Sequence, residues 1–447
     1  MVGLETNAIA LYLGAVRHWL KRTLCLIVPL KESQMYSQIC MNFTIRKSTS
    51  LSKETRETLI ELLCESIRLL IRILQKAAGT VSPACRGAFC FHVYMLYSCM
   101  FLLESQIKAD AITNASQGAP KTDTAIVEQR MRGIETLLAA SVAMDEYRTS
   151  LWQRGVVDEQ VVLIPCKMAY LLLERSTGIV ARRTHGAVPA MEILTRTAQA
   201  HGSLLTHVVA SLWDMLHNHE HAAVMLADLC TVDSNGAYLL VHEMLKEYGR
   251  LDGSGDPKMT GIKFVAPWVA HVAEQRPDWV LPHLSHLVGH LTQSEAYPLR
   301  SAVVGALSSI LLQKPQSTIS NTSNVEEPSE SDNNEQTEEA SQPTIQNTSA
   351  NLSATTREQI FQYLVVQTHD VSSFTRAAVL KAWGRLVVNG ALPKGWIQRV
   401  TQIALERLSD KTVAVRKQAM QVRHSQCFLP HITAWYFSHI LCCIISF

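Results

Sequence analysis

The chain has 447 residues, of which 47% are hydrophobic and 18% are charged. This composition predicts a large folded core and excludes both a chain that is disordered throughout and a coiled-coil or collagen-like rod. The 41 Lys and Arg residues nearly balance the 39 Asp and Glu residues, giving a formal net charge of +2. No global field therefore attracts the chain to nucleic acid, and any such binding needs a local patch.

The eleven cysteines do not resemble a disulfide framework. Their number is odd, most lie inside apolar helical runs, and no CxxC pair occurs. This pattern predicts reduced, buried thiols of a cytosolic or nuclear protein.

Helical periodicity dominates the chain, and short connections join one apolar run to the next. The pattern predicts an all-α array of antiparallel helix pairs. The predicted array begins after residues 1–53, a segment of uncertain role that lacks the features of a signal peptide. Helices are predicted at 54–77, 87–107, 125–142, 158–174, 188–200, 203–216, 220–232, 235–249, 261–274, 278–292, 297–313, 355–368, 373–389, 394–408 and 412–424. The predicted domains are helical repeats over 54–312, an acidic insert over 313–356, further repeats over 357–424 and a hydrophobic tail over 425–447.

No catalytic motif stands out, and no cofactor or metal is predicted. The run HNHEH at 217–221 has the composition of a metal cluster, but alternate residues of a helix do not share a face, and no further ligand lies at a standard spacing. An exposed turn is the favoured interpretation. A metalloenzyme that uses these histidines remains an alternative.

The insert over 313–356 is rich in Ser, Thr, Asn, Gln and Glu and almost free of large apolar residues. Between positions 326 and 339 it carries seven acids and no base. Such a segment cannot bury enough surface to offset chain entropy, so we predict a disordered spacer. Ser323 and Ser329 each have an acid three residues on, a spacing that suits an acid-directed kinase.

An internal repeat follows the insert. The run DVSSFTRAAVL at 370–380 is echoed by DKTVAVRKQAM at 410–420, and SEAYPLRSAVV at 294–304 is a weaker third copy. In the first two copies an Asp precedes an Arg by six residues. These two copies are 40 residues apart. The weaker copy begins 76 residues before the first of them, and leaving out the insert of about 36–40 residues reduces this separation to one period. A 40-residue period with two helices in each unit is typical of a HEAT/armadillo-like helical-repeat solenoid, an α-α superhelix.

The conserved spacing within the repeat has a mechanical explanation. Each Asp lies at the turn and can cap the exposed N–H groups of the second helix. Each Arg lies one turn into that helix and can reach the Asp of its own or of the adjacent repeat. We predict a ladder that comprises Asp370, Arg376, Asp410 and Arg416. Neighbouring apolar positions predict one buried face per helix, at Val379, Leu380, Trp383 and Val387 and at Trp396, Val400, Ile403, Ala404 and Leu408.

Positive charge gathers in the same repeats. Residues 370–424 contain ten Lys and Arg against three Asp and Glu. If they fall on one side of the array, five of the bases would form a phosphate-binding stripe without base readout: Lys381, Arg385, Lys394, Arg399 and Lys417. A solvated helix surface explains them equally well.

The last two repeats resemble the family of condensin complex subunit 1, the HEAT-repeat regulatory subunit of condensin I. The resemblance is carried by the opening DVSSFTR at 370–376, the ALP at 391–393 and the closing RLSDKTVAVRKQAMQ at 407–421. Weaker similarity extends upstream over most of 86–424, including AEQRP at 273–277. The resemblance implies a non-catalytic scaffold in mitotic chromosome condensation, with the ATPase activity in its partners. The implied partners are the kleisin and SMC subunits and double-stranded DNA or chromatin, without sequence specificity. The implied location is the nucleus and mitotic chromosomes, with a cytoplasmic pool.

The similarity stops near Gln421, which suggests a chain truncated at its C-terminus relative to the family. Residues 427–447 carry no Lys, Arg, Asp or Glu, but they contain Pro430 and two histidines, so a membrane anchor is not favoured. Two alternatives remain open. One is another helical-repeat adaptor, of the transport or phosphatase-scaffold type, and the other is a tail-anchored helical protein.

Overall fold

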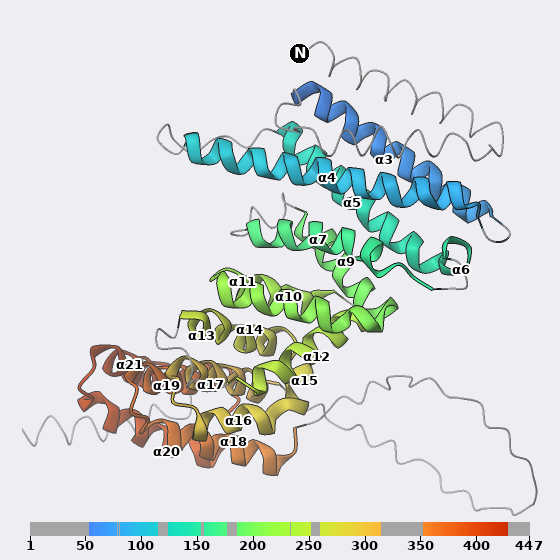
Figure 1. The fold of residues 1–447 in the computed structure, drawn as a ribbon. Helices are drawn as coiled ribbons and strands as arrows, with labels where there is room; N and C mark the ends of the chain where they lie inside the picture. The colour runs from blue at the N-terminus through green and yellow to red at the C-terminus, as the bar shows by residue number, and fades with distance from the viewer. Residues whose placement is uncertain are drawn as a thin grey trace, which may run out of the picture. The chain divides into compact units, whose positions relative to one another are not determined.

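The computed structural model describes residues 53–114, 124–152, 156–176, 186–251, 260–313 and 352–427, apart from positions 78, 80 and 233. Within these ranges every regular element is a helix, which confirms the all-α, helical-repeat prediction (Figure 1). The predicted segment 1–53 lies outside the described residues except for its last residue. So do most of the insert at 313–356 and the tail from position 428 onward.

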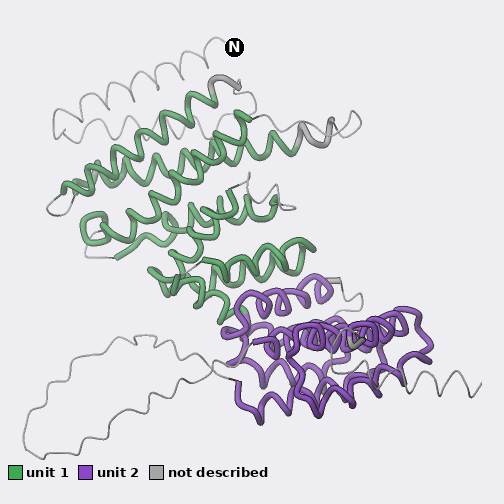
Figure 2. Tube along the Cα trace, turned by 180° about the vertical axis from the view of Figure 1, so that it is seen from behind, with its two compact units in different colours: residues 1–244 green, residues 245–447 purple. Residues whose placement is uncertain are grey.

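The chain divides into two compact units, 1–244 and 245–447 (Figure 2). Long helices at the start of the first unit pack on one another through mainly apolar sides. The helices of this unit are α3 (Lys53–Lys76), α4 (Pro83–Asn114), α5 (Thr124–Glu146), α6 (Arg148–Leu151), α7 (Glu159–Arg175), α9 (Ala187–Ala200), α10 (Leu205–Asn218), α11 (Ala222–Ala227) and α12 (Asn235–Gly249), whose end enters the second unit.

Helix α4 contains a long apolar stretch. Its stretch Cys85–Lys108 is long and apolar enough to cross a bilayer, yet half of its most apolar window is buried inside the fold. The helix packs against α3, α5 and α7, and Phe89, Leu96 and Leu103 are fully buried. Its composition is therefore accounted for by its position at the centre of this core.

The second unit consists of two layers of helices (Figure 1). One layer is a row in which α14, α17, α19 and α21 pack successively against one another, and the other contains α16, α18 and α20. The elements are α13 (Thr260–Val265), α14 (Pro267–Gln275), α15 (Pro277–Val280), α16 (Leu284–Gln293), α17 (Tyr297–Leu311), α18 (Ala354–Gln367), α19 (Ser373–Val388), α20 (Lys394–Glu406) and α21 (Val413–Cys427).

Prolines divide two of the predicted helices. The predicted helix 261–274 consists of α13 and α14, which separate at Ala266 before Pro267. The predicted helix 278–292 consists of α15, a 3-10 turn that contains Pro282, and α16. Proline lacks the N–H that a continuous helix needs, and its ring clashes with the preceding turn. Accordingly, α14 restarts with Pro267 in its first turn, and Pro282 lies in the 3-10 turn that precedes α16.

The predicted apolar faces of the last two repeats are confirmed. Val379, Leu380, Trp383 and Val387 are buried on α19, and Trp396, Val400, Ile403 and Ala404 are buried on α20. Only Leu408 differs, because it lies in a 3-10 turn after α20 and is half-exposed.

Stacked aromatic rings join the two layers. The rings of Trp383 and Trp396 lie 5.8 Å apart, and Phe361 of α18 lies 5.8 Å from the first and 4.9 Å from the second. Offset ring pairs of this kind add to the stabilisation from burial alone, so this cluster fixes how α18, α19 and α20 meet.

Candidate functional site

Two arginine–aspartate pairs join successive repeats of the second unit. Arg376 donates from Nε and Nη2 to the two carboxylate oxygens of Asp410, at 2.8 and 2.9 Å. Arg300 binds Asp370 in the same way, at 2.6 and 2.9 Å. In each pair the guanidinium comes from the second helix of one repeat, and the carboxylate comes from the turn of the next. This fork-to-fork geometry fixes orientation as well as distance.

The third nitrogen of each guanidinium binds its own repeat. Arg376 Nη1 donates to the backbone carbonyl oxygens of Asp370 and Val371, at 2.8 and 3.0 Å. The predicted alternatives, contact with the same repeat and contact with the adjacent one, therefore both occur through different atoms. One arginine side chain thus ties the turn that opens its own helix to the turn of the next repeat.

Each aspartate also orders its own turn. Asp410 Oδ1 accepts the backbone N–H of Thr412 at 2.9 Å, and Asp370 Oδ1 accepts that of Ser372 at 2.6 Å. Ser372 is itself the N-cap of α19, so Asp370 lies two residues before the cap position. The carboxylate therefore closes a turn ahead of the helix and does not cap the free N–H groups inside it.

The rungs are largely withdrawn from solvent. The side chains of Arg376 and Asp410 are 14% and 4% exposed. Hydrogen bonding from Arg376 holds the pKa of the Asp410 carboxyl below its ordinary value, and the same bond raises the pKa of Arg376. Both groups are therefore charged at neutral pH, and the pair stabilises the boundary between repeats.

The ladder changes character at each end of the described repeats. Ser294 occupies the position of the aspartate in the first copy, and its hydroxyl accepts the N–H of Ala296 at 3.2 Å. The turn is thus kept without a carboxylate. At the other end Arg416 donates from Nη1 to the carbonyl oxygens of Asp410 and Lys411, at 2.7 and 3.1 Å. Among the described residues no carboxylate meets its remaining nitrogens.

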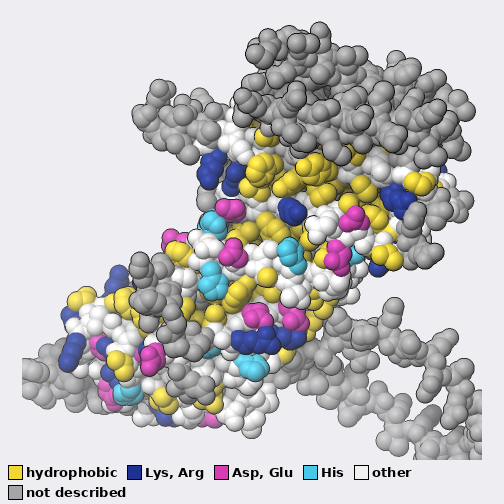
Figure 3. All heavy atoms as spheres, viewed as in Figure 1, with side chains coloured by type: hydrophobic (Ala, Val, Ile, Leu, Met, Phe, Trp, Pro, Cys, Tyr) yellow, Lys and Arg dark blue, Asp and Glu magenta, His cyan; other side chains and the backbone are white. Residues whose placement is uncertain are grey.

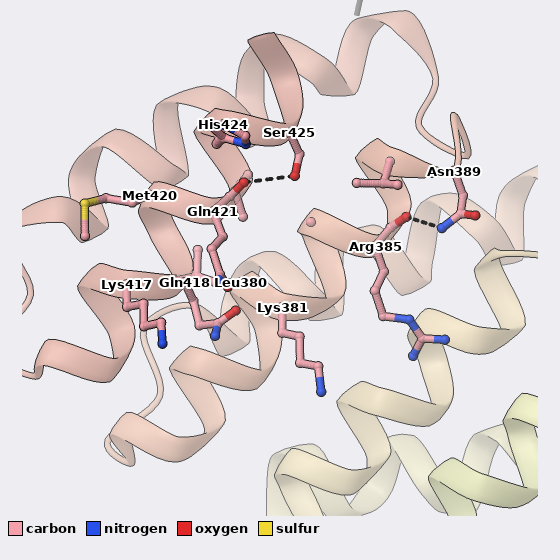
Figure 4. A pocket seen from close by; sticks show the side chains of 13 residues that line it. Leu380, Lys381, Arg385, Asn389, Lys417, Gln418, Met420, Gln421, His424 and Ser425 are labelled. Atoms are coloured by element: carbon pink, nitrogen blue, oxygen red, sulfur yellow. Dashed lines mark hydrogen bonds between the residues drawn. The ribbon is translucent and has the colours of Figure 1, made fainter. Parts of the chain in front are cut away.

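Three of the five predicted phosphate-binding residues surround one groove between α19 and α21 (Figure 4). Lys381 and Arg385 come from α19, Lys417 comes from α21, and their side chains extend to the same side of the layer. The groove encloses ≈ 700 Å³. Lys381 and Lys417 are exposed, whereas Arg385 is half-buried and binds Glu274 at 3.1 Å. The groove therefore carries two fully available cations and one that is partly neutralised.

The other two bases lie on α20, outside the lining of this groove. Lys394 is the first residue of that helix. Arg399 lies over the ring of Trp396, 4.8 Å from its centroid, and donates to Gln362 Oε1 at 3.3 Å. The five bases thus separate into a group of three on one layer and a group of two on the other.

Charges of both signs lie side by side on the visible face of the second unit. Figure 3 shows Lys and Arg side chains interspersed with Asp and Glu over the region of α19 to α21. A contact with a polyanion on this face would be local, because no broad field of one sign covers it.

The histidines and thiols have structural surroundings. His217 lies within 2.9 Å of the Trp213 carbonyl oxygen, and His219 lies 3.6 Å from Glu174. Across the described part of the chain no three His, Cys, Asp or Glu side chains converge as a metal-binding set would. Burial raises the pKa of the Cys99 thiol to about 12 and that of Cys166 to about 11. Neither thiol is a nucleophile at neutral pH.

Sequence comparison confirms the resemblance to condensin complex subunit 1. The chain is 27% identical over 275 residues to condensin complex subunit 1 of Mus musculus and 27% identical over 277 residues to that of Homo sapiens. It is 23% identical over 273 residues to the condensin-1 complex subunit CAP-D2 of Arabidopsis thaliana. These matches cover 60–61% of this chain and 17–18% of the relatives, so the chain spans less than a fifth of their length.

Two further comparisons add little. No protein-family model matches the chain. Among solved structures, the karyopherin Kap121p bound to Pho4p aligns over 92% of this chain and 45% of its own, at 10% identity and a TM-score of 0.31. A score this low carries no argument about function.

Proposed function

We propose that this chain acts as a non-catalytic scaffold in a condensin complex, where it contributes to mitotic chromosome condensation. The proposal is supported by the similarity to condensin complex subunit 1 and by the arginine–aspartate rungs that stack the repeats. A stack held in register presents continuous layers of helices, which suits the binding of extended partners. In this proposal the ATPase chemistry belongs to the SMC subunits.

The layer formed by α16, α18 and α20 is the surface we propose for the kleisin subunit. Val366 on α18 is 64% exposed and Leu405 on α20 is 40% exposed. Exposed apolar side chains on a helix layer are typical of a surface that receives an apolar anchor from a partner.

Co-purification tests the assignment to condensin. The tagged full chain, expressed in dividing cells, should recover the kleisin and SMC subunits from mitotic extracts, and imaging should place it in the nucleus and on mitotic chromosomes with a cytoplasmic pool. A Val366→Glu/Leu405→Glu variant should recover less kleisin, whereas the same change at the exposed Val413 should not. Recovery of transport cargo or phosphatase subunits alone would identify a different helical-repeat adaptor.

The groove between α19 and α21 is the surface we propose for DNA phosphates. Lys381→Glu/Lys417→Glu should weaken binding to duplex DNA and reduce the slope of log K against log salt by about 2, since each phosphate contact contributes roughly 0.9. Lys394→Glu/Arg399→Glu makes the same change in net charge outside the groove and should have the smaller effect. Unchanged binding in both variants would contradict a DNA contact in these repeats.

A further inference from the structure

The groove between α19 and α21 has an apolar floor, which the binding of a phosphate group does not require. Leu380 and Val422 are buried beneath it, Gly384 leaves room between the helices, and Val388 and Met420 remain exposed at its rim, at 68% and 56%. The cationic rim suits any anion, but the apolar floor and rim gain only from contact with an aliphatic side chain. The full groove therefore fits an acidic peptide that carries an aliphatic anchor.

The acidic insert leaves the fold from the edge on which this groove lies. Arg300 of α17 binds Asp370, just before α19, and Tyr297 stacks on Phe374 at 5.0 Å, so α17 and α19 begin side by side. The two helices are of nearly equal length and lie parallel, so they also end on a common edge. The groove is lined by residues 380–389, from the middle of α19 to its end, and by residues 417–425 of α21, so one end of the groove lies on that same edge.

A single arginine holds the two ends of the insert together. Arg357, in the first turn of α18, donates to the carbonyl oxygens of Leu311 and Gln313, each at 3.0 Å. The chain between positions 313 and 352 therefore starts and returns at one point of this edge. Both ends of its acidic part are tethered to the unit that contains the groove.

The tether is long enough to reach the groove. Position 326 lies thirteen residue steps after position 313, and an extended chain of that length spans roughly 45 Å. Neighbouring packed helices lie about 8–10 Å apart, so α21 is about 20 Å from α17. A tether of this kind also gives a millimolar effective concentration, at which weak ionic contacts suffice for occupancy.

The sequence of the insert complements the groove. Val325 is followed directly by Glu326 and Glu327, and the stretch to position 339 contains seven acids and no base. Lys381 and Lys417 are the exposed cations of the rim. One aliphatic residue beside a run of carboxylates matches one apolar floor beside two ammonium groups.

We propose that residues 325–339 dock in the groove between α19 and α21, with Val325 on the apolar floor and the following carboxylates on Lys381 and Lys417. The segment then occupies the surface proposed above for DNA phosphates and competes with them. The docking itself does not depend on DNA binding. Phosphorylation of Ser323 or Ser329 would add negative charge beside the anchor and strengthen the contact.

Zero-length carbodiimide coupling tests this docking in the full chain. The reagent joins a carboxylate to an amine only where the two form an ion pair, and mass spectrometry identifies the linked peptides. Links from 326–339 should favour Lys381 and Lys417 over Lys394, which is also exposed but lies outside the groove. They should fall about tenfold between 0.05 and 1 M salt, because screening weakens exposed ion pairs. A mixture of isotope-labelled and unlabelled chains separates links within one chain from links between chains.

Two valines provide a matched pair of variants. Val388 on the rim is 68% exposed, and Val188 of α9, outside the groove, is 68% exposed. Val388→Glu should reduce the links to Lys381 and Lys417 several-fold, whereas Val188→Glu should leave them unchanged. Equal coupling to Lys394, links only between chains, or equal effects of the two valine variants would overturn the docking.

DNA binding separates this inference from the proposed function. Replacement of the seven acids by Gln or Asn should abolish the links and tighten DNA binding, if the groove binds DNA. Specific links in a chain that does not bind DNA would support the docking and contradict the DNA contact. DNA binding without specific links would contradict the docking and support the DNA contact.

Discussion

Buried ion pairs fasten both units, but they are arranged in different ways. In the second unit the pairs Arg300–Asp370 and Arg376–Asp410 repeat one geometry at two successive boundaries. In the first unit Glu104 of α4 receives Arg130 of α5 and Arg175 of α7 in one cluster, which does not recur among the described residues of this unit. The periodic pairs set a register that can continue, whereas the cluster locks three particular helices together.

The largest difference between the units should follow from removal of the shared carboxylate. The side chains of Arg130 and Glu104 are 3% and 2% exposed, so Glu104→Gln leaves a guanidinium buried without its counter-charge. We expect a loss of about 3–5 kcal/mol in the unfolding free energy of the first unit. Urea titration monitored by hydrogen exchange should show faster exchange in α4, α5 and α7 and no change in α19. A loss spread evenly over both units would contradict the division.

Loss of one rung should have a smaller and local effect. Asp410→Asn removes the charge from two hydrogen bonds to Arg376 and should lower the stability of the second unit by about 1.5–3 kcal/mol. Hydrogen exchange should accelerate in α21 and the first half of α19. The exposed pair Arg250–Glu247 supplies the control, because Glu247→Gln should cost below about 1 kcal/mol. Equal effects of the two variants would mean that the rung is no more than a surface pair.

Acid should remove the contribution of this rung. The pKa of Asp410 is lowered in the folded chain by its bond to Arg376. Its contribution is therefore complete above the unfolded carboxyl pKa of about 3.8 and is lost as pH falls through the lower folded value. The difference in unfolding free energy between the wild type and Asp410→Asn should shrink steadily below pH 4. A difference that stays constant down to pH 2 would exclude ionisation as its source.

Two glycines with left-handed backbone give the smallest test. Gly186 in the first unit has φ +72°, and a Cβ there would lie 2.8 Å from Ile134 Cγ2. Gly390 in the second unit has φ +62° and open space around it. Both Ala variants incur the backbone cost of about 1–2 kcal/mol, and Gly186→Ala adds a steric cost of about 1 kcal/mol or more. Similar melting temperatures for the two variants would show that the core of the first unit adjusts to the added methyl group at position 186 without a steric cost.

The rungs could be predicted from the sequence because they are periodic. The Asp-to-Arg spacing repeats after 40 residues, and this spacing also indicated the helix pairs. The cluster at Glu104 has no such signal, since its partners lie 26 and 71 residues away in no repeating pattern. Only the packing of α4, α5 and α7 brings those three side chains together.

The pairing of two lysines across the groove could have been predicted from their spacing in the sequence, although not from the charge count alone. Lys381 and Lys417 are 36 residues apart, which is one repeat less one helical turn. In parallel helices of adjacent repeats, such positions are neighbours. Lys394 and Arg399 belong to the first helix of their pair, so the same rule separates them from the groove. The partial neutralisation of Arg385 by Glu274 had no signal, because the two residues lie in different repeats without a shared motif.

A double-mutant cycle on Arg376 and Asp410 tests most directly whether the rungs join neighbouring repeats into one stack. Unfolding free energies of the wild type, Arg376→Met, Asp410→Asn and the double variant yield the coupling between the two side chains. A bidentate pair withdrawn from solvent should give a coupling of about 1–3 kcal/mol, with hydrogen exchange changing on both sides of the α19–α21 boundary. A coupling near zero, or changes confined to one helix, would contradict the stack.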